Sequence, residues 1–361
     1  MRKFIVAACA TGLGLTLGAA YAASASASTT IVVWPGHSIQ AAVDSASPGD
    51  TVLIKPGVYH QSVQIRTDRI TLRGSGDFHG GTVLEPPAHF PHTICNGGFG
   101  GTAVCILAKK LNTKTGAVHT PVSNDTVTAL YITGFPANGV FGYGTRGLRV
   151  TRVVASNDGD YGISRFASTA TVFADDVATG NHEAGFYVGD SPNAATVVRD
   201  NRASGNEFGI FVRHARGVTV KGNRITGNCQ GILVLDDGQP GGAGNTTVWQ
   251  NSVFRNNKFC PKSGDTPIDI HGGGILLLGA THTTVAGNSV GENSGKQLNS
   301  GGIVVASAHP LTKGSDPNYD TIRNNTAYRD HPADLVWDTN GIGLKFTANH
   351  CGTSLPGGLC P

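Results

Sequence analysis

Glycine followed by apolar residues recurs at nearly constant intervals between residues 138 and 237. The glycines that open these runs are 23, 23, 24 and 22 residues apart: Gly139, Gly162, Gly185, Gly209 and Gly231. A fixed period of this length is typical of stacked units, each of which can bury its apolar face only against its neighbours. The pattern therefore predicts a solenoid.

Within each period, short apolar strands alternate with turns. The clearest copy, residues 218–234, alternates three strands with two turns, Gly222-Asn223 and Gly227-Asn228. Three strands per period predict a three-faced coil with apolar side chains pointing inward. Asparagine tolerates left-handed backbone and can bond to neighbouring turns, which predicts stacked asparagine ladders. Its recurring positions are Asn181, Asn201, Asn206, Asn223, Asn228, Asn251, Asn256, Asn288, Asn293 and Asn324.

The chain opens with a short amphipathic helix over 38–46, which Ser38 caps and Pro48-Gly49-Asp50 ends. Short strands follow at 51–59, 63–65 and 70–72, and the segment Ile70–Gly76 reads Ile-Thr-Leu-Arg-Gly-Ser-Gly. The exposed end of a stack of strands needs a cover, and the helix is placed to supply one.

These opening segments resemble the start of secreted right-handed parallel β-helix proteins of the pectate-lyase-like superfamily. The later repeats resemble its carbohydrate-binding/sugar-hydrolase class and the nitrous-oxide-reductase-maturation type. The resemblance covers nearly the whole mature chain. It implies an all-β fold, a single-stranded right-handed parallel β-helix of roughly ten turns with about 22–24 residues per turn and a short N-terminal capping helix. The superfamily includes lyases, hydrolases, epimerases and non-catalytic members.

The period also suggests boundaries within the chain. Residues 23–36 are expected to form a flexible mature N-terminus and a first strand, and residues 37–350 the β-helix. Loop insertions are expected where the period fails, near 77–125, 238–272 and 308–320. Residues 351–361 are expected to form a disulfide-closed C-terminal cap.

Residues 1–22 have the features of a secretory signal peptide. Arg2 and Lys3 precede an apolar run, and Ala20-Tyr21-Ala22 supplies a small-x-small cleavage site. The sequence thus predicts a secreted, extracellular protein without a membrane segment after cleavage, and we expect a monomer. The formal charge of +3 and the absence of a Lys/Arg cluster argue against a nucleic-acid partner.

Six cysteines remain in the mature chain, and an even number in an exported protein suggests disulfides. Although 15 pairings are possible, local pairing is favoured. Stacking brings the turns before Cys229 and Cys260 together, and the other pairs, Cys95 with Cys105 and Cys351 with Cys360, would each close a short loop. A metal site is the alternative, but no Cys-x-x-Cys pair favours it.

An acidic column emerges when the repeats are aligned on their glycines. Asp160, Glu183 and Glu207 each stand two positions before the glycine of consecutive repeats. Neighbours in register would lie about 4.8 Å apart, and like charges at that distance force one pKa upward. A cation, a basic partner or a held proton would relieve the repulsion, and we assign the column to substrate binding. The alternative is a column that splays into solvent.

A second group of reactive side chains follows the glycines of adjacent repeats and precedes the largest break in the period. Arg213, or calcium held by Asp190, Asp236 and Asp237, could neutralise a substrate carboxylate, and His214 or Tyr187 could remove the neighbouring proton. The catalytic candidates are therefore Tyr187, Arg213 and His214, with Ca²⁺ as a possible cofactor. The alternative is a salt-bridged, solvated edge.

These groups predict a protein that acts on or binds polysaccharide or cell-wall glycan. The favoured activity is that of a lyase or epimerase on a glycan containing uronic acid. One alternative is a non-catalytic β-helix that binds glycan, cell wall or another exported protein along its side. A second alternative is a glycoside hydrolase that uses paired carboxylates on adjacent or alternate turns.

Overall fold

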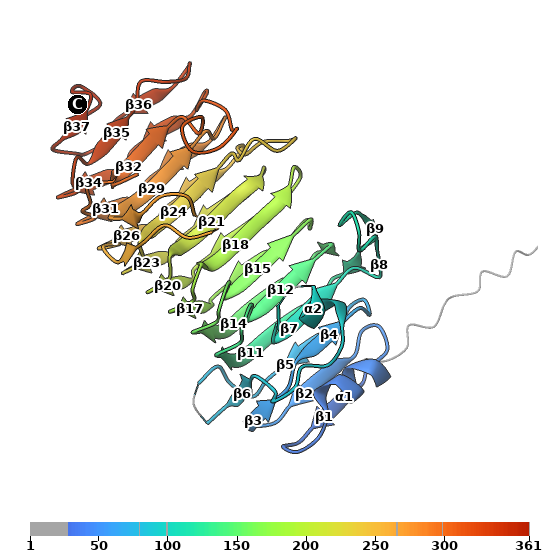
Figure 1. Cartoon of the computed structure of the whole chain (residues 1–361). Coiled ribbons are helices and arrows are strands. Elements are labelled where there is room, and N and C mark those ends of the chain that lie inside the picture. The colour runs from blue at the N-terminus through green and yellow to red at the C-terminus, as the bar shows by residue number, and fades with distance from the viewer. Residues whose placement is uncertain (1–27, 79, 99, 265, 298, 361) are drawn as a thin grey trace, which may run out of the picture.

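The computed structural model describes residues 28–78, 80–98, 100–264, 266–297 and 299–360. The expected signal peptide lies outside these residues. The strands stack along one axis from the N-terminal to the C-terminal end, as Figure 1 shows. Neighbouring strands pair in parallel with successive turns of the chain, for example Ile163 with Phe186 and Phe186 with Ile210. The predicted parallel β-helix is thus confirmed.

One face of the coil is a sheet of eleven strands. In spatial order they are β4 (Val63–Ile65), β7 (Val104–Leu107), β12 (Val140–Tyr143), β15 (Ile163–Phe166), β18 (Ala184–Ser191), β21 (Phe208–Ala215), β24 (Gln230–Leu235), β29 (Gly273–Leu278), β32 (Gly301–Ala306), β35 (Leu335–Trp337) and β37 (Ser354–Leu355). We call its solvent-facing side the outer face.

The other two faces form one continuous sheet of twenty strands, because long strands pass from one face to the next without a break. These strands are β1 (Thr30–Val33), β2 (Thr51–Ile54), β3 (Gly57–His60), β5 (Thr71–Arg73), β6 (Thr82–Glu85), β11 (Thr126–Thr133), β14 (Arg149–Ser156), β16 (Val172–Ala174), β17 (Val177–Thr179), β19 (Thr196–Arg199), β20 (Arg202–Ser204), β22 (Val218–Lys221), β23 (Arg224–Thr226), β25 (Thr247–Trp249), β26 (Ser252–Phe254), β30 (Thr284–Ala286), β31 (Ser289–Gly291), β33 (Thr321–Arg323), β34 (Thr326–Tyr328) and β36 (Lys345–Thr347). Three short pairings complete the strands: β8 (Lys110–Leu111) with β9 (Val118–Thr120), β10 (Val122–Ser123) with β13 (Thr145–Arg146), and β27 (Phe259–Cys260) with β28 (Ile270–His271).

The glycine period has a steric cause. A Cβ atom on Gly209 would lie 2.6 Å from the carbonyl oxygen of Gly231 in the next turn, and one on Gly185 would lie 2.9 Å from that of Gly209. Only glycine allows the turns to stack this closely. The residue after each glycine points into the coil, where Ile210 and Ile232 are fully buried.

The asparagine ladders form as expected, with one correction: the backbone N–H of Asn288 donates to the side chain of Asn325 at 3.0 Å, whereas Asn324 is exposed and lies outside the ladder. The side-chain oxygen of Asn228 accepts from the backbone N–H of Asn206 at 3.0 Å, and its Nδ2 donates to the carbonyl of Ala203 at 3.2 Å. Each member thus satisfies backbone groups of the preceding turn, which would otherwise be buried without partners. The ladder continues through Asn256 and Asn293 to Asp330.

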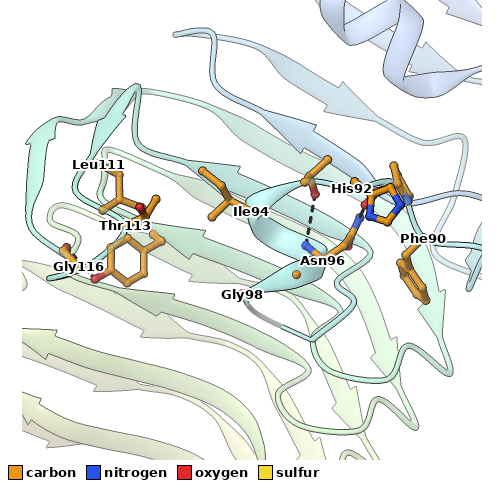
Figure 2. A pocket seen from close by; sticks show the side chains of 12 residues that line it. Phe90, His92, Ile94, Asn96, Gly98, Leu111, Thr113 and Gly116 are labelled. Carbon is orange, nitrogen blue, oxygen red and sulfur yellow. Dashed lines mark hydrogen bonds between the residues drawn. The ribbon is translucent and has the colours of Figure 1, made fainter.

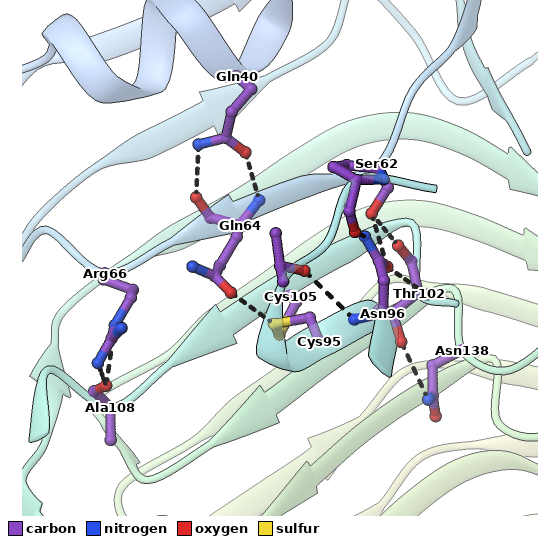
Figure 3. The surroundings of a disulfide bond; sticks show 12 residues. Gln40, Ser62, Gln64, Arg66, Cys95, Asn96, Thr102, Cys105, Ala108 and Asn138 are labelled. Carbon is purple, nitrogen blue, oxygen red and sulfur yellow. Dashed lines mark hydrogen bonds between the residues drawn. A yellow bond between two sulfur atoms is a disulfide. The ribbon is translucent and has the colours of Figure 1, made fainter. Parts of the chain in front are cut away.

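The helix α1 (Ile39–Ser45) covers the N-terminal end of the coil. Its Gln40 side chain donates to the carbonyl of Gln64 at 3.0 Å and accepts from the Gln64 N–H at 2.7 Å, as Figure 3 shows. The Gln40 amide therefore takes the place of a neighbouring strand at the free edge of β4. Such an edge would otherwise be open to pairing with another chain.

All three expected disulfides are present. Cys95 pairs with Cys105, Cys229 with Cys260, and Cys351 with Cys360. The first ties the short helix α2 (Ile94–Gly97) to β7 (Figure 3), and the last closes the C-terminal segment beside β37.

The loop insertions are shorter than the ranges expected from the breaks in the glycine period. Residues 77–125 include β6 and β7, which pair in register with their neighbours, and the range 238–272 includes β25 and β26. The period is hard to see there because loops separate the strands. Residues of two loops border the outer face: the 257–272 loop after β26 and the 307–316 loop after β32.

Candidate functional site

The outer face is apolar where the sequence predicts polar chemistry. One column of side chains in register runs from Tyr187 through Phe211, Leu233 and Leu276 to Val304. The 257–272 and 307–316 loops contribute to the walls of a groove of about 370 Å³ over this column. Its floor includes Phe208, Phe211, Leu233 and Leu276, and polar groups reach it from Glu183, Arg213, Gln230, Asp237, Thr266 and Asn299. We call this hollow the aromatic groove.

Tyr187 is enclosed, with only 1% of its surface exposed. Its ring centroid lies 4.5 Å from that of Tyr161 and 4.6 Å from that of Phe166, and its ring occupies the space that a side chain at Gly189 would need. Burial raises the pKa of its hydroxyl, against the effect of the neighbouring Arg213. This environment does not suit the predicted role of Tyr187 as a base.

His214 also differs from the expectation. Its side chain is 10% exposed, its Nε2 lies 2.7 Å from the carbonyl oxygen of Pro240, and its Nδ1 lies 3.3 Å from Asp190. A carbonyl only accepts, so Nε2 carries a proton and holds the loop that follows β24. His214 does not line the aromatic groove, and its contacts assign it to loop anchoring.

Arg213 does line the groove, but it is paired. Its Nε donates to Asp237 at 3.0 Å, and the neighbouring negative charges raise its pKa against the effect of burial. Because Asp237 offsets its charge, Arg213 is poorly placed to neutralise a second carboxylate.

The three aspartates expected to hold calcium have different protein partners. Asp190 contacts His214, Asp236 accepts from the Ser315 hydroxyl at 2.7 Å, and Asp237 binds Arg213. Within the described ranges, no three His, Cys, Asp or Glu side chains are grouped to hold a metal ion. The geometry therefore does not support the expected calcium site, and calcium binding stays an untested prediction.

The acidic column does come together. A hydrogen bond joins the carboxyls of Asp160 and Glu183, and Tyr161 donates to Glu183. Burial, the hydrogen bond with Asp160 and the charges of Asp160 and Glu207 raise the pKa of Glu183 to about 8. Glu207, in the next turn, accepts from the Thr266 hydroxyl at 2.8 Å. Glu183 is thus a carboxylic acid that holds its proton at neutral pH.

Glu183 lies where two hollows meet. One is the aromatic groove, and the other is an acidic hollow of about 310 Å³ lined by Asp160, His182, Glu183, Glu207 and Thr266, among others. Glu183 and Thr266 line both. A chain-like ligand that occupies both hollows would pass beside the protonated carboxyl.

A further hollow lies toward the N-terminal end of the same face. It has a volume of about 730 Å³ and lies between α2 and the β8–β9 hairpin, as Figure 2 shows. Phe90, Ile94, Leu111 and Tyr143 give it a largely apolar lining, and the Tyr143 hydroxyl donates to the carbonyl of Gly116 at 2.8 Å.

Sequence reasoning missed Gln230, Thr266 and Asn299. Gln230 carries a usable signal, because it stands directly before a key glycine, where Ala184 and Phe208 occupy the same column in earlier turns. Thr266 belongs to an inserted loop without periodicity, so nothing in the sequence places it beside Glu207.

Comparison with solved structures supports the fold. The A-module of a mannuronan C-5 epimerase from Azotobacter vinelandii is 18% identical, with a TM-score of 0.57 over 88% of this chain and 92% of that one. An alginate lyase from Paenibacillus sp. is 15% identical, with a TM-score of 0.58 over 87% and 99%. DFA-IIIase from Arthrobacter chlorophenolicus is 13% identical, with a TM-score of 0.60 over 86% and 78%. At these identities the likeness concerns the fold alone.

No curated protein matches the sequence. Among the described residues, no helix is long and apolar enough to cross a membrane. The family model for the right-handed β-helix region matches residues 138–327, more than half of the chain. That match includes the glycine period, β18, β21 and the acidic column. The chain therefore belongs to the right-handed β-helix family.

Proposed function

We propose that the protein is an exported glycoside hydrolase that binds a neutral polysaccharide across the outer face and uses Glu183 as its proton donor. The observation that carries this proposal is the position of Glu183, a buried carboxyl that is hydrogen-bonded to Asp160 and has a raised pKa, at the junction of two hollows. Carbohydrate-active proteins among the solved structures with this fold support the ligand class.

The acidic column supplies the groups that hydrolysis needs. Glu183 would transfer its proton to the glycosidic oxygen as the bond to the anomeric carbon breaks, and Glu207, one turn away, would attack that carbon to form a glycosyl-enzyme. The Glu207 carboxyl is held by the hydrogen bond that it accepts from the Thr266 hydroxyl. Glu183, left ionised, would then take a proton from a water that attacks the anomeric carbon, which breaks the bond to Glu207 and restores both carboxyls.

The same column disfavours the polyuronate lyase or epimerase expected from the sequence. The carboxyls of Asp160 and Glu207 flank the neutral Glu183 and disfavour a polyanion, and Arg213 is paired with Asp237. The candidate bases, Tyr187 and His214, are buried or bound to other groups. A neutral glycan avoids this repulsion.

Three disulfides support the proposed location outside the cytoplasm, because such bonds persist in oxidising compartments.

The test is incubation with neutral polysaccharides (cellulose, xylan, mannan, chitin and inulin) and with alginate and polygalacturonate. We expect new reducing ends from at least one neutral polymer, and a loss of about 10²–10⁴-fold in rate for Glu183→Gln, the usual effect of removing a general acid. Glu85→Gln, at an exposed carboxyl paired with His60 on another face, is the matched control. Cleavage of only the uronates with ultraviolet-absorbing unsaturated ends would overturn the proposal, and so would no cleavage at all.

A further inference from the structure

One buried oxygen in the aromatic groove has no hydrogen-bond donor among the described residues. It is Oε1 of Gln230, a residue that is fully buried and lines the groove. We propose that Gln230 selects the sugar by accepting a hydrogen bond from a hydroxyl or amide N–H of the unit bound in the groove. This rests on the carbohydrate ligand of the proposed function and adds the group that recognises it.

The orientation of the Gln230 amide is fixed by its other end. Nε2 donates to the carbonyl of Gly274 at 3.1 Å and lies 3.4 Å from that of Ile232. Rotating the amide would place its oxygen against two carbonyls, which only accept. Oε1 is thus held as an acceptor, and the ligand must supply a donor.

The backbone of the next turn leaves room for the Gln230 amide in this orientation. Gly273 occupies the same column in the next turn, and a Cβ atom there would collide with the amide of Gln230. A second buried oxygen without a donor, Oδ1 of Asn299, belongs to another residue of the groove lining. Two unpaired acceptors in one groove match a ligand rich in donors.

The chemistry of these acceptors narrows the ligand. A desolvated amide oxygen attracts hydroxyl and N–H groups and repels carboxylates and sulfate esters, which present only oxygens with negative charge. The ligand therefore carries a free hydroxyl or an acetamido group, and not a carboxylate or sulfate ester, at the contacted position; the neutral glycan of the proposed function meets this requirement. A buried acceptor without a donor also destabilises the free protein, so this residue trades stability for recognition.

The test measures binding separately from cleavage, in a Glu183→Gln background. Cellohexaose, xylohexaose, mannohexaose, chitohexaose and hexagalacturonate are titrated by calorimetry, and the tightest neutral ligand is compared with its monodeoxy (or N-deacetylated) analogues. In the protein that retains Gln230, we expect one analogue to bind at least tenfold more weakly than the unmodified sugar. Gln230→Met should abolish this difference in affinity. Gln64→Met, on β4 of the same sheet outside the groove, should retain it.

Thermal unfolding of the free protein supplies an independent readout. We expect the Gln230→Met variant to melt at the same temperature as the protein that retains Gln230, or higher. Its affinity for the unmodified sugar should fall by about the same factor as the protein that retains Gln230 loses when the critical hydroxyl or amide is removed from the sugar. Equal discrimination in the Gln230→Met protein, or no binding of any neutral hexasaccharide, would overturn the proposal. If polysaccharide is cleaved but Gln230→Met still distinguishes the sugar from its analogue, only the role of Gln230 is wrong. If Gln230 distinguishes the two ligands but no polysaccharide is cleaved, only the hydrolase activity is wrong.

Discussion

Asp160 and Glu183 lie in neighbouring turns of the β-helix, and a hydrogen bond joins their carboxyls. Such a bond requires a proton on one of the two, and burial keeps that proton on the pair up to a pH of about 8, the pKa of Glu183. The pairing is a direct consequence of the period, because residues at equal distances before successive glycines stack in one column.

The pH dependence of hydrolysis should report this pair. The acid form of Glu183 is the active one, so kcat/KM should fall above a pH of about 8, where Glu183 ionises. Asp160→Asn removes a negative charge that raises the pKa of Glu183, and the alkaline limb should therefore move to lower pH. A profile from pH 4 to 10 on the best neutral polymer checks both shifts. An alkaline limb that Asp160→Asn leaves in place would contradict the coupling.

Removing the Tyr187 hydroxyl should change activity little. Tyr187 packs against Tyr161 and Phe166 and is almost fully buried, so Tyr187→Phe keeps the packing that supports the groove. We expect a rate within about threefold of the wild type and a loss of stability of about 1 kcal/mol, the usual effect of one hydrogen bond. Initial rates and urea unfolding measure the two effects. A rate loss of the size expected for a catalytic base would restore the lyase interpretation.

Asp330 should make stability depend on pH. It ends an asparagine ladder, where its Oδ1 accepts from Asn293 while its Oδ2 is buried without a partner among the described residues. Burial raises its pKa from 3.8 to about 7. Stability from this group is therefore complete below pH 3.8, the unfolded value, and is lost as the pH rises through about 7.

Asp330→Asn places an amide where its ladder neighbours have one, and should remove this loss. At pH 8 the variant should be more stable by up to about 4 kcal/mol, since each pKa unit corresponds to about 1.4 kcal/mol. At pH 4 it should gain little. Urea unfolding at both values measures the difference, with the exposed Asp44→Asn on α1 as control. An equal change in the free energy of unfolding at pH 4 and pH 8 would show that the ionisation of Asp330 does not cause the loss of stability.

Arg165 is a charged side chain in the core of the coil. It is fully buried, donates to Ser191 and to the Thr196 hydroxyl at 2.6 Å, and its pKa is lowered by burial to about 9. No ion pair involving it occurs within the described ranges, so its hydrogen bonds and the more distant charge of Asp190 offset the cost of burying its charge only in part.

Arg165→Met should therefore stabilise the protein by about 1–4 kcal/mol, the range seen when buried ionic groups give way to apolar side chains of similar volume. Ser191 and Thr196 keep their own hydrogen bonds to the carbonyls of Gly189 and Ala194. Chemical unfolding measures the gain. A clear loss of stability would show that the hydrogen bonds of Arg165 outweigh its desolvation.

The fold could be predicted from the sequence because its causes are local and repeated. Gly185 and Gly209 mark where stacked backbones leave no room for a Cβ atom, and Asn206 and Asn228 mark turns whose backbone groups need partners. The same periodicity placed Asp160, Glu183 and Glu207 in one column and brought Cys229 near Cys260.

The roles of individual side chains were harder to predict. Alternation correctly turns Tyr187 away from the interior of the coil, but a second apolar layer covers it there. That layer depends on the 257–272 and 307–316 loops, whose paths carry no periodic signal. The partners of His214 and Asp236, Pro240 and Ser315, likewise lie in loops, so the two residues appeared available for chemistry when they anchor loops instead.

The most direct test of Glu183 as proton donor compares two substrates of the same sugar that differ in their leaving group. Departure of a sugar hydroxyl needs a proton, whereas departure of 2,4-dinitrophenolate does not. Glu183→Gln should lose about 10²–10⁴-fold in kcat/KM on the oligosaccharide and little in kcat/KM on the dinitrophenyl glycoside. An equal loss on both substrates, or none on either, would contradict the assignment of Glu183.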